Sequence, residues 1–343
     1  MGRPPVCRDR RHEVNALVEN RPAIAQPTRL VVALDDGYPA YDQETAVLAG
    51  VGAAFTVRAC HGSEAAAIAA VSEADAVLVR ESPVSRRVID AMQRCQAIVR
   101  YGIGVDNIDL VAARERRIAV ANVPDYGIDE VSTQAVALLL AVVRRLRLHD
   151  REVREGRWST GVLQPMYRLR GRTLGLVGYG RIARMTHEML GGFGFARVLV
   201  HDPAADLPAG IESASMDEIC SQADVISLHA PFTPQTRHII DADRIALMRP
   251  TAIVVNTARG GLLDLQALHA ALVERRILGA GLDVFETEPP GPQHPLYALD
   301  NVVLTNHIGW YSEEAMRGVQ RKAAEEAARV LQGHTPKHWL NAW

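Results

Sequence analysis

The sequence predicts an α/β protein built on two doubly wound parallel sheets. The chain has 343 residues, which is enough for two domains of ordinary size. From residue 29 onward, short apolar runs alternate with amphipathic stretches, an order typical of parallel strands joined by helices. Residues 173–202 combine two apolar runs, a glycine turn and a terminal acid. Together these features predict two Rossmann-like domains, one of which binds a dinucleotide.

The first sheet is predicted from apolar runs in the first third of the chain. Amphipathic stretches separate these runs, and one helix is expected to begin at Gln43. The strands that we expect are residues 30–34, 76–79, 97–99 and 118–120. Residues 1–28 combine arginine and proline without periodicity, so a flexible extension or a misassigned start is expected there.

A long helix is predicted over residues 130–154. Asp129 and Glu130 suit its first turn, because negative charge is favourable at a helix N-terminus. Its apolar positions recur at helical spacing, but they form a stripe wider than one interface needs. We therefore expect this helix to lie between domains or between subunits.

The dinucleotide fingerprint follows that helix. Gly178 permits a tight turn after the first apolar run, and Gly180 allows the backbone to approach a pyrophosphate. Ala183 replaces the third glycine but still permits close packing, and Asp202 suits a ribose 2′-hydroxyl, which favours NAD over NADP. An ordinary tight turn in a plain α/β domain is the alternative. The cofactor-binding residues predicted here are Gly178, Tyr179, Gly180, Arg181, Ile182 and Asp202.

Four further apolar runs complete the second sheet, and a last helix is expected over residues 312–331. The strands are residues 225–228, 252–255, 280–282 and 302–304. The last helix would return the chain to the first sheet. The cofactor domain is therefore predicted at residues 124–308, inserted in a discontinuous outer domain made of residues 29–123 and 309–343.

Three polar side chains follow strands of the second sheet. Arg259, Glu288 and His307 come after the runs ending at residues 255, 282 and 304, so they are expected at the sheet edge that lines the ligand crevice. Reduction of a 2-oxo acid needs a cation for the carboxylate and the carbonyl oxygen, which a guanidinium supplies. It also needs a proton donor, such as a histidine supported by a carboxylate. Taken singly, each residue also fits an ordinary surface or loop position.

The composition excludes several other classes of function. A net charge of −2 gives no reason to expect nucleic acid or an acidic membrane surface as a direct partner. The 4 cysteines lack metal-ligand or disulfide spacing, so we expect no metal site. The absence of a disulfide pattern also favours a cytoplasmic location. Lysine is almost absent beside arginine, which is typical of a GC-rich, bacterial coding sequence.

Several motifs in the second half resemble successive signatures of the D-isomer-specific 2-hydroxyacid dehydrogenases. They are VGYGRIA, HDP, SLHAPFTPQTRHII, VNTARGGLLD, GLDVFETEPP and NHIGW, and the similarity extends from residue 30 to residue 341. The resemblance implies that Arg259 binds substrate, that His307 is the acid/base group and that Glu288 supports it. It also implies cofactor contacts for Asp202, Ala230, Pro231, Thr236, Thr257, Ala258, Asp283, His307 and Gly309.

The segment VRYGIGVDNID is similar to the family's loop that binds the substrate carboxylate through backbone N–H groups. The resemblance gives the substrate-binding candidates Arg100, Tyr101, Gly102, Ile103, Arg259 and Trp310. Arg100 and Trp310 look most like the C-terminal-binding-protein branch and its bacterial relatives. Trp310 would wall a pocket for an apolar or thioether chain, or would simply pack at the domain interface.

The sequence thus predicts a cytoplasmic NAD-dependent oxidoreductase that interconverts a 2-oxo acid and a D-2-hydroxy acid. A homodimer is expected. Two alternatives stay open: an NAD-sensing corepressor or binding module, and a phosphite- or formate-type dehydrogenase on the same scaffold. The particular 2-hydroxy acid is not determined, because the pocket depends on side chains from both domains.

Overall fold

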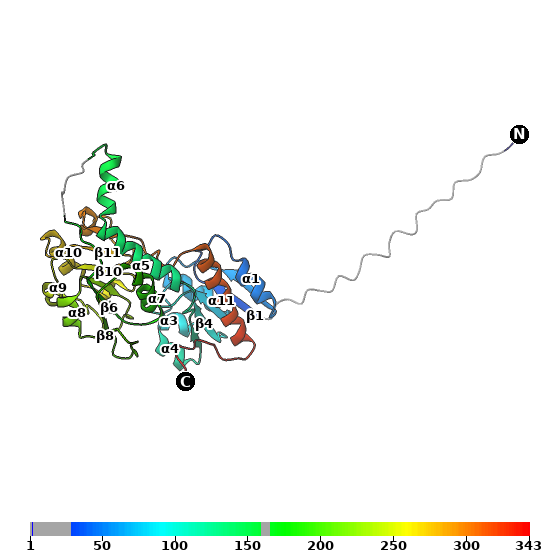
Figure 1. Cartoon of the computed structure of the whole chain (residues 1–343). Coiled ribbons are helices and arrows are strands. Elements are labelled where there is room, and N and C mark those ends of the chain that lie inside the picture. The colour runs from blue at the N-terminus through cyan, green and yellow to red at the C-terminus, as the bar shows by residue number, and fades with distance from the viewer. Residues whose placement is uncertain (1, 3–28, 159–164) are drawn as a thin grey trace.

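The chain folds into two lobes, each built around one parallel sheet (Figure 1). The structure is a computed structural model that describes residue 2, residues 29–158 and residues 165–343. Apart from residue 2, the extension predicted at residues 1–28 lies outside the described residues. The α/β class and the two parallel sheets predicted from the sequence are confirmed.

The first sheet has 5 strands in the order β2-β1-β3-β4-β5. The strands are β1 (Arg29–Ala33), β2 (Ala53–Val57), β3 (Ala76–Val79), β4 (Ala97–Arg100) and β5 (Ala119–Ala121). The helices of this part of the chain are α1 (Asp42–Ala49), α2 (Glu64–Val71), α3 (Arg86–Asp90) and α4 (Leu110–Glu115). Neighbouring β1 residues face opposite sides: Val31 joins one buried cluster and Val32 joins another. The sheet is therefore covered on both faces, as its apolar strands require.

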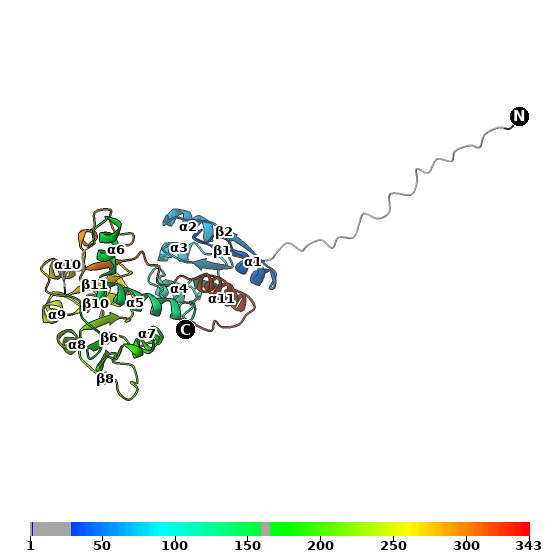
Figure 2. The ribbon, with the colours of Figure 1, turned by 45° about the horizontal axis from the view of Figure 1, so that its top comes forward.

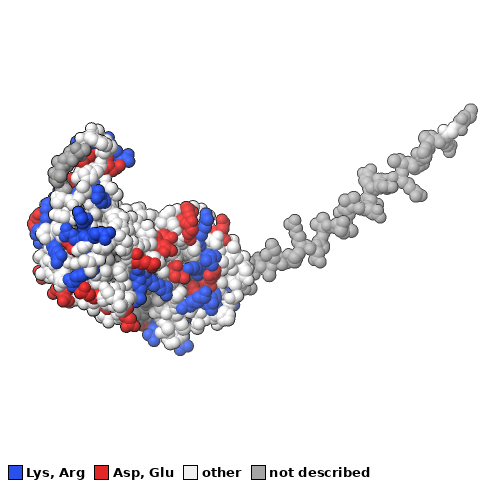
Figure 3. Space-filling view, viewed as in Figure 1, with Lys and Arg blue, Asp and Glu red and all other residues white. Residues whose placement is uncertain are grey.

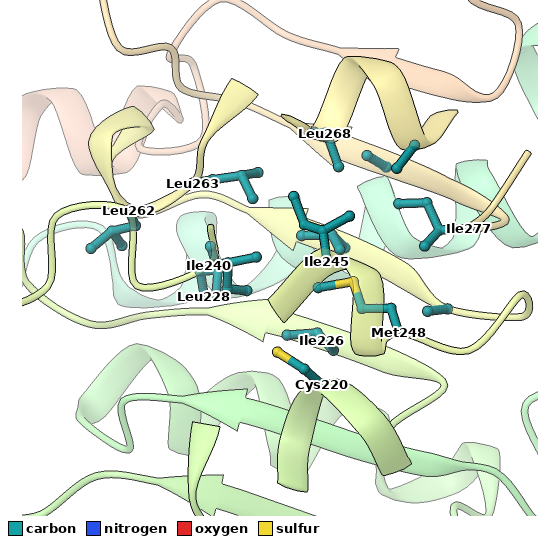
Figure 4. Packing of buried hydrophobic residues seen from close by; sticks show 14 of the residues in the cluster. Cys220, Ile226, Leu228, Ile240, Ile245, Met248, Leu262, Leu263, Leu268 and Ile277 are labelled. Carbon is teal, nitrogen blue, oxygen red and sulfur yellow. The ribbon is translucent and has the colours of Figure 1, made fainter. Parts of the chain in front are cut away.

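The second sheet has 7 strands in the order β12-β11-β10-β9-β6-β7-β8. They are β6 (Thr173–Val177), β7 (Arg197–His201), β8 (Glu212–Ser213), β9 (Val225–Leu228), β10 (Ile253–Asn256), β11 (Gly279–Leu282) and β12 (Val302–Leu304). Its helices are α5 (Ile128–Val143), α7 (Arg181–Leu190), α8 (Met216–Gln222), α9 (Ala242–Leu247) and α10 (Leu265–Val273). Short 3-10 turns lie at Gly191–Phe193, Gly260–Leu262 and Pro295–Ala298. Figure 4 shows the apolar side chains that fill one face of this sheet, with Ile226 and Ile245 among them.

The closing helix α11 (Glu313–Leu331) packs on the first sheet rather than the second. Val319 and Ala323 are fully buried in the same cluster as Val31 of β1. Figure 2 shows α11 beside α1, at the other end of the molecule from β10. This packing supports a discontinuous outer domain, and the boundaries at residues 123/124 and 308/309 stay a prediction.

The single long helix predicted over residues 130–154 is wrong, because the structure has two helices. α5 ends at Val143, Arg145 adopts a left-handed conformation with φ of 48°, and α6 (Leu146–Arg154) then begins. The Arg145 guanidinium donates to the carbonyl oxygen of Pro165 from Nε at 3.2 Å and from Nη2 at 3.1 Å. This contact holds the break, so α6 leaves the direction of α5 and projects from the lobe (Figure 1).

The described surface carries both signs of charge. Figure 3 shows Lys and Arg interspersed with Asp and Glu over both lobes of the face in view. No described helix combines the length and the apolar character that crossing a bilayer requires.

Candidate active site

The glycine turn after β6 has the geometry that a dinucleotide site needs. Gly178 has a φ of 86°, and a Cβ there would lie 2.8 Å from the backbone nitrogen of Ala230, so only glycine fits. A Cβ at Gly180 would meet nothing within 4 Å. α7 begins directly after Gly180 without a side-chain cap, so its first N–H groups stay available to an anion.

Asp202 lies at the end of β7, next to this turn. Its Oδ2 accepts a hydrogen bond from the Tyr179 N–H at 2.8 Å, and its Oδ1 accepts one from the Ala204 N–H at 3.0 Å. The two bonds fix the carboxylate beside the turn, and each oxygen keeps a lone pair for a ribose hydroxyl.

Thr257 is a buried residue whose hydroxyl oxygen has no hydrogen-bond partner among the described residues. It follows β10, in a turn that Asn256 holds by accepting from the Ala258 N–H at 3.0 Å and donating to the Arg259 oxygen at 2.9 Å. A buried hydroxyl without a partner is costly, and a bound ligand would satisfy it. The open space at Gly180, the carboxylate of Asp202 and this hydroxyl together fit a dinucleotide, NAD(P).

The loop at residues 230–236 covers the same edge of the sheet. Ala230 lies against Gly178, while the Thr236 hydroxyl donates to the Pro231 oxygen at 2.7 Å. The loop is thus closed on itself next to the predicted cofactor site. Direct cofactor contacts of Pro231, Thr236, Arg181 and Ile182 stay predictions.

His307 and Glu288 form a pair at the ends of β12 and β11. His307 Nδ1 lies 2.6 Å from Glu288 Oε2, and both side chains are partly exposed. Burial alone would raise the pKa of Glu288, but hydrogen bonds from His307 and from the Phe285 N–H outweigh burial and hold that pKa below its usual value. An ionised Glu288 stabilises a protonated imidazole, so the pair is suited to holding a proton.

Asp283 holds the backbone that carries His307. It is 2% exposed, and its Oδ1 accepts from the Thr305 hydroxyl at 2.5 Å and from the Ile308 N–H at 3.0 Å. Its Oδ2 accepts from the Gly309 N–H at 2.9 Å. In this structure Asp283 therefore positions the His307 loop, and the predicted contacts of Asp283 and Gly309 with the nicotinamide stay predictions.

Arg259 connects the loops of the two sheets. Its Nε donates to Asp106 Oδ2 at 2.9 Å and its Nη1 donates to the Ala258 oxygen at 2.7 Å. A Cβ at Gly104 would lie 1.6 Å from Arg259 Nη2, so the guanidinium occupies the space that the glycine leaves. Arg259 thus lies directly against the loop after β4.

The loop after β4 offers backbone donors beside Arg259. Gly102 has a φ of 143°, and the N–H groups of Ile103 and Gly104 have no hydrogen-bond partner among the described residues. Two free N–H groups next to a guanidinium make a seat for a carboxylate. This arrangement supports the predicted substrate loop.

Arg100 lies at the base of this loop. Its Nη1 donates to the Tyr101 oxygen at 2.8 Å, whereas its buried Nε has no partner among the described residues. Burial lowers the pKa of Arg100, and the nearby Arg259 acts in the same direction, while Tyr126 opposes them. A desolvated cation beside another cation favours an anionic ligand.

Tyr101 differs from the prediction, because its side chain does not face the substrate loop's donors. Its ring is 2% exposed within the apolar cluster of the first sheet, and its hydroxyl donates to Glu44 Oε1 at 2.9 Å. Side chains of an extended segment alternate between opposite faces, so the residue after Arg100 points into the core. The Tyr101 N–H donates to the Val79 oxygen at 2.8 Å, so Tyr101 offers no free donor to a substrate and instead anchors the start of the loop.

Sequence reasoning missed Arg80 and Tyr126. The Trp310 ring lies with its centroid 6.2 Å from that of Tyr126 and 5.7 Å from Cζ of Arg80. Arg80 follows β3 and Tyr126 lies five residues after β5, at strand ends like those that revealed Arg259. Applying the same rule to the first sheet would have found them. Trp310 is half-buried and packs against the apolar cluster of the first sheet, with the Arg80 guanidinium over its ring.

Comparison with known proteins decides the family. Residues 136–309 match the model of the D-isomer specific 2-hydroxyacid dehydrogenase, NAD binding domain. The chain belongs to the D-isomer-specific 2-hydroxyacid dehydrogenase family. It is therefore an oxidoreductase that acts on a CH–OH group with NAD(P) as the acceptor.

Relatives in this family align with about three quarters or more of the chain. D-3-phosphoglycerate dehydrogenase of Methanocaldococcus jannaschii is 39% identical over 79% of the chain, which spans only 52% of that relative's length. Hydroxypyruvate reductase of Thermotoga maritima is 39% identical over 76% of the chain and 86% of the relative. A crystal structure of a Thermus thermophilus protein superposes with a TM-score of 0.84 at 35% identity, over 91% of this chain and 99% of that one. None of these three is named as a C-terminal-binding protein.

Proposed function

We propose that this dehydrogenase reduces a small 2-oxo acid to the D-2-hydroxy acid with NADH, and catalyses the reverse reaction with NAD. The observation that carries the proposal is the His307–Glu288 pair, whose Nδ1 and Oε2 atoms lie 2.6 Å apart. Arg259 and the free N–H groups of Ile103 and Gly104 support it, because they offer a seat for a carboxylate.

The nicotinamide, when bound, supplies the hydride. His307 gives a proton to the forming alkoxide, and Glu288 orients the imidazole and stabilises the charge of its protonated form. Arg259 binds the carboxylate and polarises the C2 oxygen through its fork of donors. The ion pair between Arg259 and Asp106 joins loops of the two sheets. Closure of the two lobes at this contact would shield the bound substrate from water.

NAD is the proposed cofactor in preference to NADP. The carboxylate of Asp202 is held beside the glycine turn by the Tyr179 and Ala204 N–H groups. It would accept bonds from a ribose and repel a 2′-phosphate. The same assays run with NADH and with NADPH test this preference.

The C-terminal-binding-protein-like branch stays a proposal that rests on Arg100 and Trp310. Arg100 ends β4 directly before the substrate loop, and Trp310 packs beside Tyr126, positions that fit a substrate site as well as a sensor. We further propose a cytoplasmic homodimer. The cysteines of the described chain, Cys60, Cys95 and Cys220, are free thiols, as a reducing compartment requires.

Steady-state reduction of glyoxylate, hydroxypyruvate and larger 2-oxo acids tests the activity. We expect His307→Ala to lower kcat about 10²- to 10⁴-fold, the range of a positioned acid, with little change in NADH affinity. Near-normal turnover in this variant would assign the proton to another residue. Turnover of no 2-oxo acid by the wild type, with tight NADH binding, would favour the sensor.

A further inference from the structure

A carboxylate without a cation lies beneath the substrate loop. Glu44 of α1 is 0% exposed, and among the described residues its partners are neutral. Tyr101 donates to Oε1 at 2.9 Å, and Gln320 Nε2 lies 3.2 Å from each carboxylate oxygen. Burial raises the pKa of Glu44. Burying a carboxylate costs free energy that these neutral donors only partly offset. Glu44 therefore contributes less to the stability of the fold than to the placement of the groups bonded to it.

The bond from Tyr101 fixes the start of the substrate loop. Tyr101 comes directly before Gly102, and its own N–H donates to the Val79 oxygen at 2.8 Å. Its ring also lies edge-on to Tyr38, with the centroids 5.3 Å apart. Within the described part of the chain, the hydroxyl bond is the hydrogen bond that ties this side chain to another element. The main chain of the loop is also held by the Val123 N–H, which donates to the Gly102 oxygen at 2.9 Å, and by Asn122 Nδ2, which donates to the Ile103 oxygen at 2.6 Å. The Tyr101 hydroxyl bond adds a side-chain anchor at the start of the loop that carries the donors of Ile103 and Gly104.

Gln320 extends the same network to α11. Its Nε2 also donates to the Ala40 oxygen at 2.7 Å, next to α1. α11 is the helix that follows the segment with His307 and Trp310. Glu44 thus connects the substrate loop with the helix behind the acid/base segment.

We propose that Glu44 is a positioning residue for the substrate, because through the Tyr101 hydroxyl it anchors the start of the loop whose Ile103 and Gly104 N–H groups seat the carboxylate. This proposal rests on the proposed function. A residue that acts through the loop affects substrate binding more than the chemical step, whereas a merely structural residue would change stability without this selectivity.

Kinetics of Tyr101→Phe and Glu44→Gln test the proposal. Loss of a hydrogen bond to a charged group should raise KM for the 2-oxo acid about 10-fold. We expect kcat to stay within about 2-fold and the Kd of NADH to stay unchanged, since the cofactor turn is untouched. The double variant should be no worse than the worse single variant, because Tyr101→Phe removes the same bond that Glu44→Gln weakens by removing the acceptor's charge.

Tyr41→Phe is the matched control. It removes a hydroxyl from the same aromatic cluster, but that hydroxyl donates to the Asp35 main-chain oxygen at 2.7 Å and not to Glu44. KM should stay at the wild-type value. An unchanged KM in Tyr101→Phe, or an equal rise in Tyr41→Phe, would overturn the proposal, and Tyr101→Phe alone suffices if Glu44→Gln does not fold.

Amide hydrogen exchange separates this proposal from the proposed function. In the full chain with NADH, the hydrogen-bonded amides of Tyr101 and Gly102, which donate to the oxygens of Val79 and Arg100, should exchange about 10-fold faster in both variants than in the wild type. Peptides from β9 and β10 serve as the internal reference. Unchanged exchange of these two amides would overturn the Glu44 proposal. Absence of wild-type turnover would instead contradict the proposed function, and exchange alone would then decide the role of Glu44.

Discussion

At the scale of single residues, Arg259 is the group in which charge and geometry can be separated. Its fork reaches Asp106 from Nε and Ala258 from Nη1, and Nη2 lies against Gly104. A lysine at this position keeps the charge but cannot hold these directions together. Recognition of a planar carboxylate depends on the same fork.

We expect Arg259→Lys to lower kcat/KM for the 2-oxo acid about 100-fold, and Arg259→Ala to lower it at least as much. The measurement is kcat/KM at one pH with saturating NADH. Arg197→Lys is the matched control, because Arg197 makes a two-point contact with Glu212 on β7 and β8 at the sheet edge. Equal values for wild type and Arg259→Lys would contradict a bidentate clamp.

Some candidate site residues are predictable from the sequence, whereas others are brought to the site only by the fold. Arg259, Glu288 and His307 each follow an apolar strand, so the rule for parallel sheets brings them together from the sequence alone. Arg80 also follows a strand, but one of the first sheet, and its contact with Trp310 joins segments far apart in the chain. Glu44 carries no such signal. Its importance arises from Tyr101, which packs against it, and contacts between distant segments are not visible in a single sequence.

At the scale of secondary structure, burial decides which elements are predictable. β3 and β9 are buried at every position, and their apolar runs mark them at once. β2 is an edge strand with mostly half-buried residues, and β8 consists of just 2 residues, both exposed. Neither strand is apolar throughout, so neither is predicted from the sequence. The break at Arg145 was missed because its bond to Pro165 spans 20 residues.

His229, at the end of β9, gives an element-scale prediction. Burial lowers its pKa to about 4, and its Nε2 lies 2.9 Å from the Ser227 hydroxyl. In the unfolded chain an imidazole takes up a proton near pH 6.5, so between pH 6.5 and 4 the unfolded state binds more protons than the folded state. The stability of the fold is therefore complete above this window and falls as the pH falls through it.

We expect His229→Gln to remove part of this acid sensitivity. The full shift would cost about 2 kcal/mol between pH 7.5 and pH 5, and we expect about 1 kcal/mol because the residue keeps some contact with solvent. Urea unfolding of wild type and variant at the two pH values measures the difference. If both proteins lose the same free energy of unfolding, His229 is not responsible for the pH dependence.

At the scale of the whole molecule, the projecting α6 is the feature that the rest of the fold leaves unexplained. The apolar face of α5 is used within its own lobe, where Leu138 and Leu139 are buried. Beyond the break, Leu146 is 54% exposed, Val153 57% and Trp158 82%. Apolar groups gathered on a projecting segment are unfavourable in water and are typical of a surface that another chain covers.

We therefore expect the protein to sediment as a dimer of its 37.4 kDa chain at micromolar concentration, with α6 in the interface. Val153→Glu combined with Trp158→Ser should shift the equilibrium towards the monomer, because a carboxylate in an apolar contact is desolvated without a partner. NADH binding should persist, since the Gly178–Gly180 turn is unchanged. Leu247→Ser is the matched control: Leu247 on α9 is 46% exposed but does not lie on α6. Sedimentation equilibrium of the wild type, the double variant and the control measures the oligomeric state. A monomeric wild type would contradict the dimer, and a dimer that persists in the double variant would show that α6 is not in the interface.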